Sequence, residues 1–305
     1  MKIILMGQQI FGRRTLEEFH KETNHKVVAV YCMPDKNSKS IDPVKEYAQS
    51  YGIPLFQPSN FNEQKVLDQI KSHDADLCVM AYVTIFLPRV ARNIPKHGTI
   101  CFHPSLLPVH RGPSSINWPI IKGANKTGLT IFYPNDDLDE GEILLQKEVE
   151  IGPDDTLGDL YFSKIFQPGI EACIEAVNLI AAGNAPRIAQ DESKATYESW
   201  CKKVNAKIDW KKPGIEIYNL IRGCNPQPGA WAKLKGKELT FFDTTFKNDK
   251  NTKYFSGQII SINTKDIDIA VKGGFLKVSR FKSDQGKLYV KDMNIADFSK
   301  GDLFS

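Results

Sequence analysis

Residues 2–31 read "KIILMGQQIFGRRTLEEFHKETNHKVVAVY" and indicate the class of fold. An apolar run at 2–7 ends in glycine, a stretch with helical periodicity follows, and a second apolar run closes the segment. Strands that are apolar at nearly every position are buried on both faces, as they are in a parallel sheet. The segment therefore predicts a strand, a helix and a second, parallel strand.

The same alternation continues as far as residue 103. Further apolar runs stand at "IPLF" (53–56), "ADLCVMAY" (75–82) and "GTICFH" (98–103), and helix-like stretches separate them. This repetition predicts an α/β fold with a doubly wound, mostly parallel sheet.

The chain has 305 residues, which is enough for two domains. The polar segment 184–207 lacks clean periodicity, so we expect a linker there, after a catalytic domain at 1–183. One helical stretch at 214–223 is followed by several β-rich runs. They predict a smaller, OB-like β-barrel domain over 208–305.

The composition of the chain excludes disordered, fibrous and membrane-spanning proteins. Charged residues make up 25% of the chain and the net charge is +4, as in an ordinary globular protein. The six cysteines form no C-x-x-C pair, and no apolar stretch approaches the roughly 20 residues of a membrane span. We therefore expect a cytoplasmic protein with reduced thiols, no membrane partner and no metal site.

Glycines at 7 and 12, in "GQQIFGRRT" (7–15), have the spacing of a phosphate loop. The lysine that such a loop requires is missing, so nucleotide hydrolysis is not expected. We interpret the segment as a tight turn from a strand into a helix, at the sheet edge where ligands bind.

The segment "HPSLLPVHRGP" (103–113) is the strongest candidate for a site. His103 ends a buried run, where side chains reach the carboxyl edge of the sheet. Three prolines exclude regular structure, so the segment predicts a rigid loop that holds side chains in one geometry. We interpret His103 as the candidate catalyst and His110 as support for the loop.

An acidic loop, "NDDLDEGE" at 135–142, is the second candidate. A charge run of this kind is typical of a solvated surface. This one lies between two apolar runs, and Leu138 among the charges suggests that the loop packs inward. We expect it to bring one carboxylate toward His103, which would favour the charged, donating form of the imidazole.

Together with "GQQIFG", "NLIRG" and "PGAW", these segments resemble, in the same order, the folate-dependent formyltransferase superfamily. Within it the chain is most similar to the hydrolase domain of 10-formyltetrahydrofolate dehydrogenases, and next to the methionyl-tRNA formyltransferases. The resemblance implies the formyltransferase fold, with 10-formyltetrahydrofolate as the substrate or formyl donor.

The resemblance also implies roles for individual residues. His103 matches the catalytic histidine and Asp139 the catalytic aspartate, and Ser105 could hold the attacking water. The pterin ring is expected against residues 80–88, and the glutamate tail near basic side chains such as Arg111. The residues expected to bind folate are Phe11, Met80, Ala81, Tyr82, Ile85, Phe86, Leu87, Arg111 and Asp137.

The identity of residue 101, a cysteine, helps to predict which molecule accepts the formyl group. Transferases of the superfamily carry an asparagine two residues before the catalytic histidine, and a thiol is a weaker donor than an amide. The cysteine favours water as the acceptor, with formate and tetrahydrofolate as products. The short loop at 32–43 has only two lysines, so tRNA is possible but not favoured as a partner.

Two alternatives stay open. The chain could be a methionyl-tRNA formyltransferase or another formyltransferase that uses 10-formyltetrahydrofolate. It could also be a folate-binding module of a longer protein that adds a carrier domain and an aldehyde-dehydrogenase domain.

Overall fold

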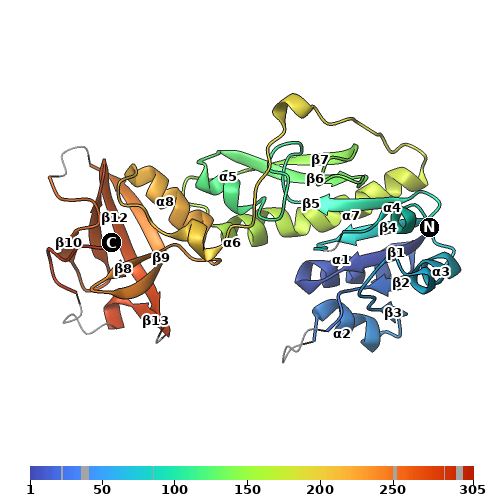
Figure 1. The fold of residues 1–305 in the computed structure, drawn as a ribbon, viewed down its shortest axis with the longest axis horizontal. Coiled ribbons are helices and arrows are strands. Elements are labelled where there is room, and N and C mark those ends of the chain that lie inside the picture. The colour runs from blue at the N-terminus through green and yellow to red at the C-terminus, as the bar shows by residue number, and fades with distance from the viewer. Residues whose placement is uncertain (22, 36–40, 85, 250–252, 285, 293–297) are drawn as a thin grey trace. The chain divides into compact units, whose positions relative to one another are not determined.

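The computed structural model describes residues 1–21, 23–35, 41–84, 86–249, 253–284, 286–292 and 298–305 (Figure 1). These residues form two compact units, each assembled from three separate segments of chain. The first unit contains Met1–Pro113, Gly128–Val149 and Lys164–Tyr197. The second contains Ser114–Thr127, Glu150–Ser163 and Glu198–Ser305.

A seven-stranded sheet forms the centre of the first unit, with the strand order β3-β2-β1-β4-β5-β6-β7. β1 pairs in parallel with β2 and β4, β2 with β3, and β4 with β5, whereas β6 is antiparallel to β5. The predicted doubly wound, mostly parallel sheet is therefore confirmed. The strands are β1 (Lys2–Gly7), β2 (Lys26–Tyr31), β3 (Leu55–Phe56), β4 (Leu77–Ala81), β5 (Thr99–His103), β6 (Lys126–Phe132) and β7 (Ile143–Glu150).

Helices cover both faces of this sheet (Figure 1). On one face Ile4 of β1 and Met80 of β4 pack in one apolar cluster with Ile70 of α3. On the other face Phe102 of β5 stacks on Phe11 of α1, with ring centroids 4.4 Å apart. The helices of this unit are α1 (Gln9–Lys21), α2 (Pro43–Ser50), α3 (Gln64–Ser72), α4 (Arg89–Arg92) and α7 (Phe166–Ala181).

Asp42 fixes the start of two of these helices. Its carboxylate caps α2 by accepting a hydrogen bond from Val44 N, and Pro43 occupies the first helical position, where no amide hydrogen is needed. The same carboxylate accepts hydrogen bonds from Gln9 N at the start of α1, at 3.1 and 3.2 Å. One side chain therefore ties the β1–α1 turn to α2.

The second unit contains a curled antiparallel sheet with the order β10-β11-β12-β9-β8, and β13 pairs with β12. Within the described ranges no pairing joins β10 to β8, so the predicted barrel is a half-barrel. Its strands are β8 (Trp231–Leu234), β9 (Lys237–Asn248), β10 (Ile259–Ile262), β11 (Ile267–Val271), β12 (Gly274–Ser283) and β13 (Gly286–Tyr289). The helices are α5 (Asn117–Ile121), α6 (Leu157–Asp159) and α8 (Gly214–Gly223).

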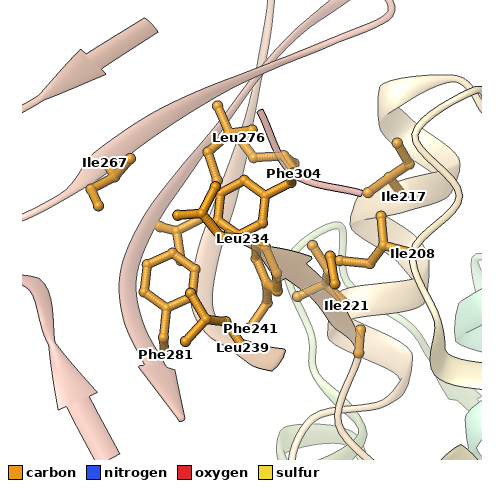
Figure 2. Packing of buried hydrophobic residues seen from close by; sticks show 14 of the residues in the cluster. Ile208, Ile217, Ile221, Leu234, Leu239, Phe241, Ile267, Leu276, Phe281 and Phe304 are labelled. Atoms are coloured by element: carbon orange, nitrogen blue, oxygen red, sulfur yellow. The ribbon is translucent and has the colours of Figure 1, made fainter. Parts of the chain in front are cut away.

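The inner face of the half-barrel packs against α8 (Figure 2). Ile217 and Ile221 of the helix join Phe241, Phe281 and Phe304 in one buried cluster. Buried positions alternate along the first part of β12, at Gly274, Leu276 and Val278, which is the pattern expected of a strand with one buried face. No helix within the described parts of the chain is long and apolar enough to cross a membrane.

Candidate functional site

The order of strands reverses at β1, which has β2 on one side and β4 on the other. Ligands of open α/β sheets bind outside the carboxyl ends of the strands at such a point. Gly7 ends β1 beside Ala81 of β4, and α1 begins two residues later. A Cβ on Gly7 would lie 3.0 Å from the Ala81 carbonyl oxygen, so glycine lets the two backbones approach. The segment "GQQIFG" therefore forms the predicted turn from strand to helix.

His103 is the last residue of β5 and is 7% exposed. Its Nε2 lies 3.0 Å from the carbonyl oxygen of His110, and because a carbonyl oxygen only accepts, Nε2 carries a proton. Its Nδ1 faces Asp139 Oδ2 at 3.6 Å, which is too long for a direct hydrogen bond. The loop thus holds one ring nitrogen, while the other faces the carboxylate without a direct bond.

Asp139 approaches this histidine from the loop between β6 and β7. Its backbone has φ +58°, in the left-handed region that aspartate and asparagine tolerate better than most residues. Its Oδ2 accepts a 2.8 Å hydrogen bond from Gly112 N, which fixes the carboxylate beside the loop of His103. The structure brings the two residues together, but Leu138 is 55% exposed. The loop therefore packs toward His103 through Asp139, and not through the leucine that suggested this packing.

The start of the acidic loop is held by two arginines of α4. Arg89 and Arg92 both donate hydrogen bonds to the carboxylate of Asp136. Hydrogen bonds and charge from these guanidinium groups, Arg92 first, lower the pKa of Asp136 from its ordinary value. Sequence reasoning missed this contact, because nothing in the spacing of the residues relates α4 to the acidic loop.

Ser105 is fully buried and supports the loop that follows β5. Its hydroxyl donates a 2.7 Å hydrogen bond to the carbonyl oxygen of Val109. Its own carbonyl oxygen accepts a 2.7 Å hydrogen bond from the Thr130 hydroxyl. Holding the attacking water stays a prediction for Ser105, and its contacts favour a structural role.

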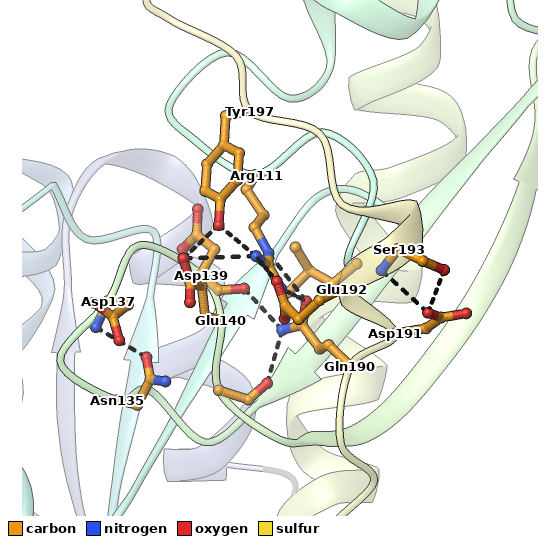
Figure 3. A network of polar contacts seen from close by, with 12 residues as sticks. Arg111, Asn135, Asp137, Asp139, Glu140, Gln190, Asp191, Glu192, Ser193 and Tyr197 are labelled. Carbon is orange, nitrogen blue, oxygen red and sulfur yellow. Dashed lines mark hydrogen bonds and ion pairs between the residues drawn. The ribbon is translucent and has the colours of Figure 1, made fainter.

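Arg111 lies in a buried polar network, in contrast to the expectation that it reaches a glutamate tail (Figure 3). Its side chain is completely inaccessible to solvent. The guanidinium donates to both carboxylate oxygens of Glu192, at 2.6 and 2.9 Å, and to the Tyr197 hydroxyl. It also donates to Gln190 Oε1 at 2.8 and 3.1 Å. Because protein groups already accept the hydrogen bonds of the guanidinium, Arg111 has no N–H group left to bind the glutamate tail of folate.

Part of the expected pterin-binding segment is buried against the sheet. Ala81 is fully buried in β4, and Met80 and Leu87 line a small cavity together with Met6 and Gln8. This cavity measures about 10 Å³, which is room for about one water molecule. The cavity is therefore too small to hold a pterin ring.

Other expected folate-binding residues lie at the surface. Tyr82 and Phe86 are 42% and 63% exposed and so offer aromatic surface at the end of β4. Ile85 lies outside the described residues. Asp137 is exposed on the acidic loop, where its backbone amide donates a hydrogen bond to the Asn135 side chain at 3.1 Å.

Phe11, which was expected to bind folate, lies in the apolar interior of the first unit. It is fully buried, stacks on Phe102, and contacts Phe166 edge to face with centroids 5.6 Å apart. The reason is the helical periodicity of α1, which directs Phe11 toward the sheet between β5 and α7.

Cys101 lies two residues before His103 in β5, so both side chains are on the same face of the sheet. It packs against an apolar cluster of Leu107, Phe132 and Ile143. Burial first, and the charge of Asp139 second, raise the pKa of its thiol well above the ordinary value. The thiol is therefore neutral at physiological pH and is a poor nucleophile.

Gln190 is a further residue that sequence reasoning missed. It belongs to the polar segment that was expected to be a linker, yet its side chain contacts both the acidic loop and Arg111. Because the polar residues around Gln190 show no periodicity, the sequence did not predict that its side chain contacts these groups. In the parts of the chain that the structure describes, no group of three or more His, Cys, Asp or Glu side chains is placed to hold a metal ion.

Comparison with known proteins identifies the family of the chain. The chain matches a family model described as formyl transferase over residues 1–177, and one described as formyl transferase, C-terminal domain, over residues 201–303. It is 40% identical over 303 residues to cytosolic 10-formyltetrahydrofolate dehydrogenase from Xenopus laevis, covering 97% of this chain and 33% of the relative. The chain thus spans about a third of that protein.

A second relative is matched along nearly its whole length. Methionyl-tRNA formyltransferase from Fusobacterium nucleatum is 34% identical over 293 residues, with 94% of each chain covered. Among solved structures, HypX from Aquifex aeolicus in complex with tetrahydrofolic acid has a TM-score of 0.68 at 16% identity, over 95% of this chain and 46% of that one. The chain therefore belongs to the formyl transferase family.

Proposed function

We propose that this chain hydrolyses 10-formyltetrahydrofolate to formate and tetrahydrofolate. The observation that carries the proposal is the pairing of His103 with Asp139 at the carboxyl end of β5, with Nδ1 and Oδ2 3.6 Å apart. A histidine and a carboxylate at this spacing can act on one small carbonyl group. Similarity to 10-formyltetrahydrofolate dehydrogenases and methionyl-tRNA formyltransferases supports folate as the ligand.

The proposed reaction passes through a tetrahedral oxyanion. Water attacks the formyl carbon as Asp139 accepts its proton, while the Nδ1–H group of a protonated His103 donates to the formyl oxygen. Collapse of the intermediate breaks the bond between carbon and N10, and the proton held by Asp139 passes to N10. A donor aimed at the oxyanion contributes roughly 10²- to 10³-fold, and a general base roughly 10²- to 10⁴-fold.

The contact between Nε2 and the His110 carbonyl supports this division of roles. Because that contact fixes the ring through Nε2, Nδ1 is the nitrogen that can donate to substrate. The Gly112 amide holds one oxygen of Asp139 and leaves the other for water.

Cys101 supports water as the acceptor. A neutral thiol in this position is a weaker donor toward the formyl group than the amide of an asparagine. Hydrolysis needs no binding site for a large acceptor, and a cytosolic location would match the first relative.

Transfer to methionyl-tRNA is the second candidate, and the 34% identity to the Fusobacterium transferase over 293 residues favours it. If the dehydrogenase is the better guide, the chain functions as the hydrolase or folate-binding module of a longer protein, with a carrier domain and a dehydrogenase domain as partners.

The test of the reaction compares acceptors. Purified protein is given 10-formyltetrahydrofolate with water alone, with methionyl-tRNA, or with a sugar-nucleotide amine, and formate and formylated products are measured. We expect formate at the same rate in all three mixtures. Formyl-methionyl-tRNA as the main product would instead establish the transferase, and absence of turnover with every acceptor would leave only the folate-binding module.

The test of the residues uses His103→Ala and Asp139→Asn. Asparagine is chosen because it tolerates the left-handed backbone at 139 and removes only the charge. Each variant is expected to lower kcat by at least about 10²-fold. The matched controls are His97→Ala and Asp68→Asn, both of surface residues, and they should keep wild-type rates. Near-normal turnover in either site variant would refute the assignment.

A further inference from the structure

Residues 187–197 form a segment, here called the strap, that is bound to both loops of the site. On one side Ile188 and Ile143 at the start of β7 exchange two backbone hydrogen bonds, of 2.8 and 2.9 Å. On the other, Thr196 N donates to Pro108 O at 3.1 Å, and Arg111 N donates to Thr196 O at 2.9 Å. The strap therefore connects the loop of His103 to the end of the acidic loop.

Gln190 lies between these two attachments. Its Nε2 donates to the carbonyl oxygens of Asp139, at 2.8 Å, and of Gly141, at 2.7 Å. Its Oε1 accepts from two nitrogens of the Arg111 guanidinium. Both hydrogens of the amide are thus used on the acidic loop, and its oxygen on the loop of His103 (Figure 3).

Arg111 determines the orientation of this amide. A guanidinium has only donors, so the atom of Gln190 that faces it must be the oxygen, and the NH₂ group is then directed at the two carbonyls. The guanidinium itself is held by both carboxylate oxygens of Glu192 and by the Tyr197 hydroxyl. An amide fixed at both ends can impose a geometry on the loop that it contacts.

The loop needs such a constraint because its backbone is in an uncommon conformation. Asp139 has φ +58°, and in that conformation its carboxylate accepts from Gly112 N and faces His103. A catalytic group displaced by about 1 Å can lose about 10²-fold in rate. Two carbonyls held by one amide, at Asp139 and two residues later, limit that displacement.

We infer that Gln190 is a positioning residue, which sets the position of the Asp139 carboxylate relative to His103 and acts through Asp139 alone. The inference rests on the proposed hydrolysis by these two residues. It gives the strap a part in the rate of the reaction, exerted through the position of Asp139.

The test is Gln190→Glu, which has the same shape but places an oxygen against two carbonyl oxygens. We expect kcat for formate release to fall by about 10- to 10²-fold. KM for 10-formyltetrahydrofolate should stay within about threefold, since Gln190 is not placed against the substrate. Gln69→Glu on α3 makes the same change of charge away from the site and should keep the wild-type kcat. A wild-type kcat in Gln190→Glu would overturn the inference.

A second comparison separates positioning from general damage. If Gln190 acts through Asp139, then adding Gln190→Glu to Asp139→Asn should lower kcat by less than about twofold further. A further loss as large as that in the single variant would overturn the inference. Gln190→Met, with similar volume and no charge, serves in the same comparisons if Gln190→Glu does not fold. Absence of turnover in the wild-type protein would refute the proposed hydrolysis itself.

Discussion

Two neighbouring side chains of β5 have very different chemistry although they share one face of the sheet. His103 has both ring nitrogens directed at oxygen atoms, whereas Cys101 has an apolar cluster around it. The raised pKa keeps the thiol of Cys101 protonated at neutral pH. Position in the strand thus separates a candidate catalyst from a residue that only fills space.

We therefore expect Cys101→Ala to hydrolyse 10-formyltetrahydrofolate at a rate within about threefold of wild type. A protonated thiol neither attacks the formyl carbon nor donates strongly to its oxygen, so little is lost when it is removed. Steady-state formate release is the measurement, and Cys173→Ala, another buried cysteine of the first unit, is the control. A loss of tenfold or more in Cys101→Ala alone would assign the thiol a part in the reaction.

The sequence predicted the two main residues of the site, His103 and Asp139, but not the residues that surround them. A histidine at the end of an apolar strand and an acidic loop between two apolar runs were enough to predict that one carboxylate approaches His103, and the resemblance to the formyltransferase superfamily identified that carboxylate as Asp139. Arg111 was misinterpreted because its partners Gln190 and Glu192 lie in an aperiodic segment far along the chain. Local periodicity describes strands and helices, whereas contacts between distant polar residues depend on the completed fold.

At the scale of elements, the strap is held to the loop of His103 by a charge pair that acid can break. Hydrogen bonds from Arg111 lower the pKa of Glu192 below its ordinary value of 4.5. A carboxylate whose pKa is lower in the folded than in the unfolded state stabilises the fold fully when the pH is above its unfolded-state pKa. This stabilisation is lost as the pH falls through its folded-state pKa. The strap should therefore be most firmly attached above about pH 4.5.

The direction of this pH dependence gives a prediction for Glu192→Gln. The variant should melt at a lower temperature than wild type near neutral pH, and the difference should shrink as pH is lowered below 4.5. Thermal unfolding followed by circular dichroism at several pH values measures it. Glu171→Gln, a surface substitution on α7, provides the control. A difference that is constant over the whole range would show that the charge of Glu192 is not what stabilises the strap.

Packing between α5 and α8 gives another prediction at this scale. A Cβ on Gly223 would lie 2.7 Å from Ile121 Cγ1 and 3.1 Å from Ile121 N, so the two helices leave no room for a side chain. Gly223→Ala is expected to destabilise the protein by about 1–3 kcal/mol, as overpacking does. Urea unfolding measures the loss. Ile215→Ala, at an exposed position of the same helix, is the control, and a similar loss there would show that the effect is not one of packing.

At the scale of the whole molecule, the second unit depends on segments far from its C-terminal part. Asn117 of α5 donates to Gly223 O and Gln227 O at 2.9 and 3.0 Å. Tyr218 of α8 donates to Asp154 at 2.8 Å, and Arg222 donates to carbonyl oxygens of the same intervening segment. Burial lowers the pKa of Arg222, so its charge needs these acceptors.

A fragment of residues 198–305 should therefore be less stable than the same residues in the full chain. It lacks Asp154, the acceptor of Tyr218, and two acceptors of Arg222, the carbonyl oxygens of Gly152 and Asp155. Each buried group left without a partner costs roughly 1–3 kcal/mol. The midpoint of urea unfolding measures the change, followed by the fluorescence of Trp200, Trp210 and Trp231 in the fragment and of these with Trp118 in the full chain. An unchanged midpoint would show that the intervening segments add no stability.

Assembly of each unit from three segments also constrains how members of the family can recombine. A crossover near residue 200 would join the half-barrel and α8 of one parent to the α5 of another. The hybrid would inherit Gly223 and Ile121 from different ancestors, although they pack against each other. Selection should therefore preserve these positions as a set, and viable hybrids should come from parents that agree at Asn117, Ile121 and Gly223.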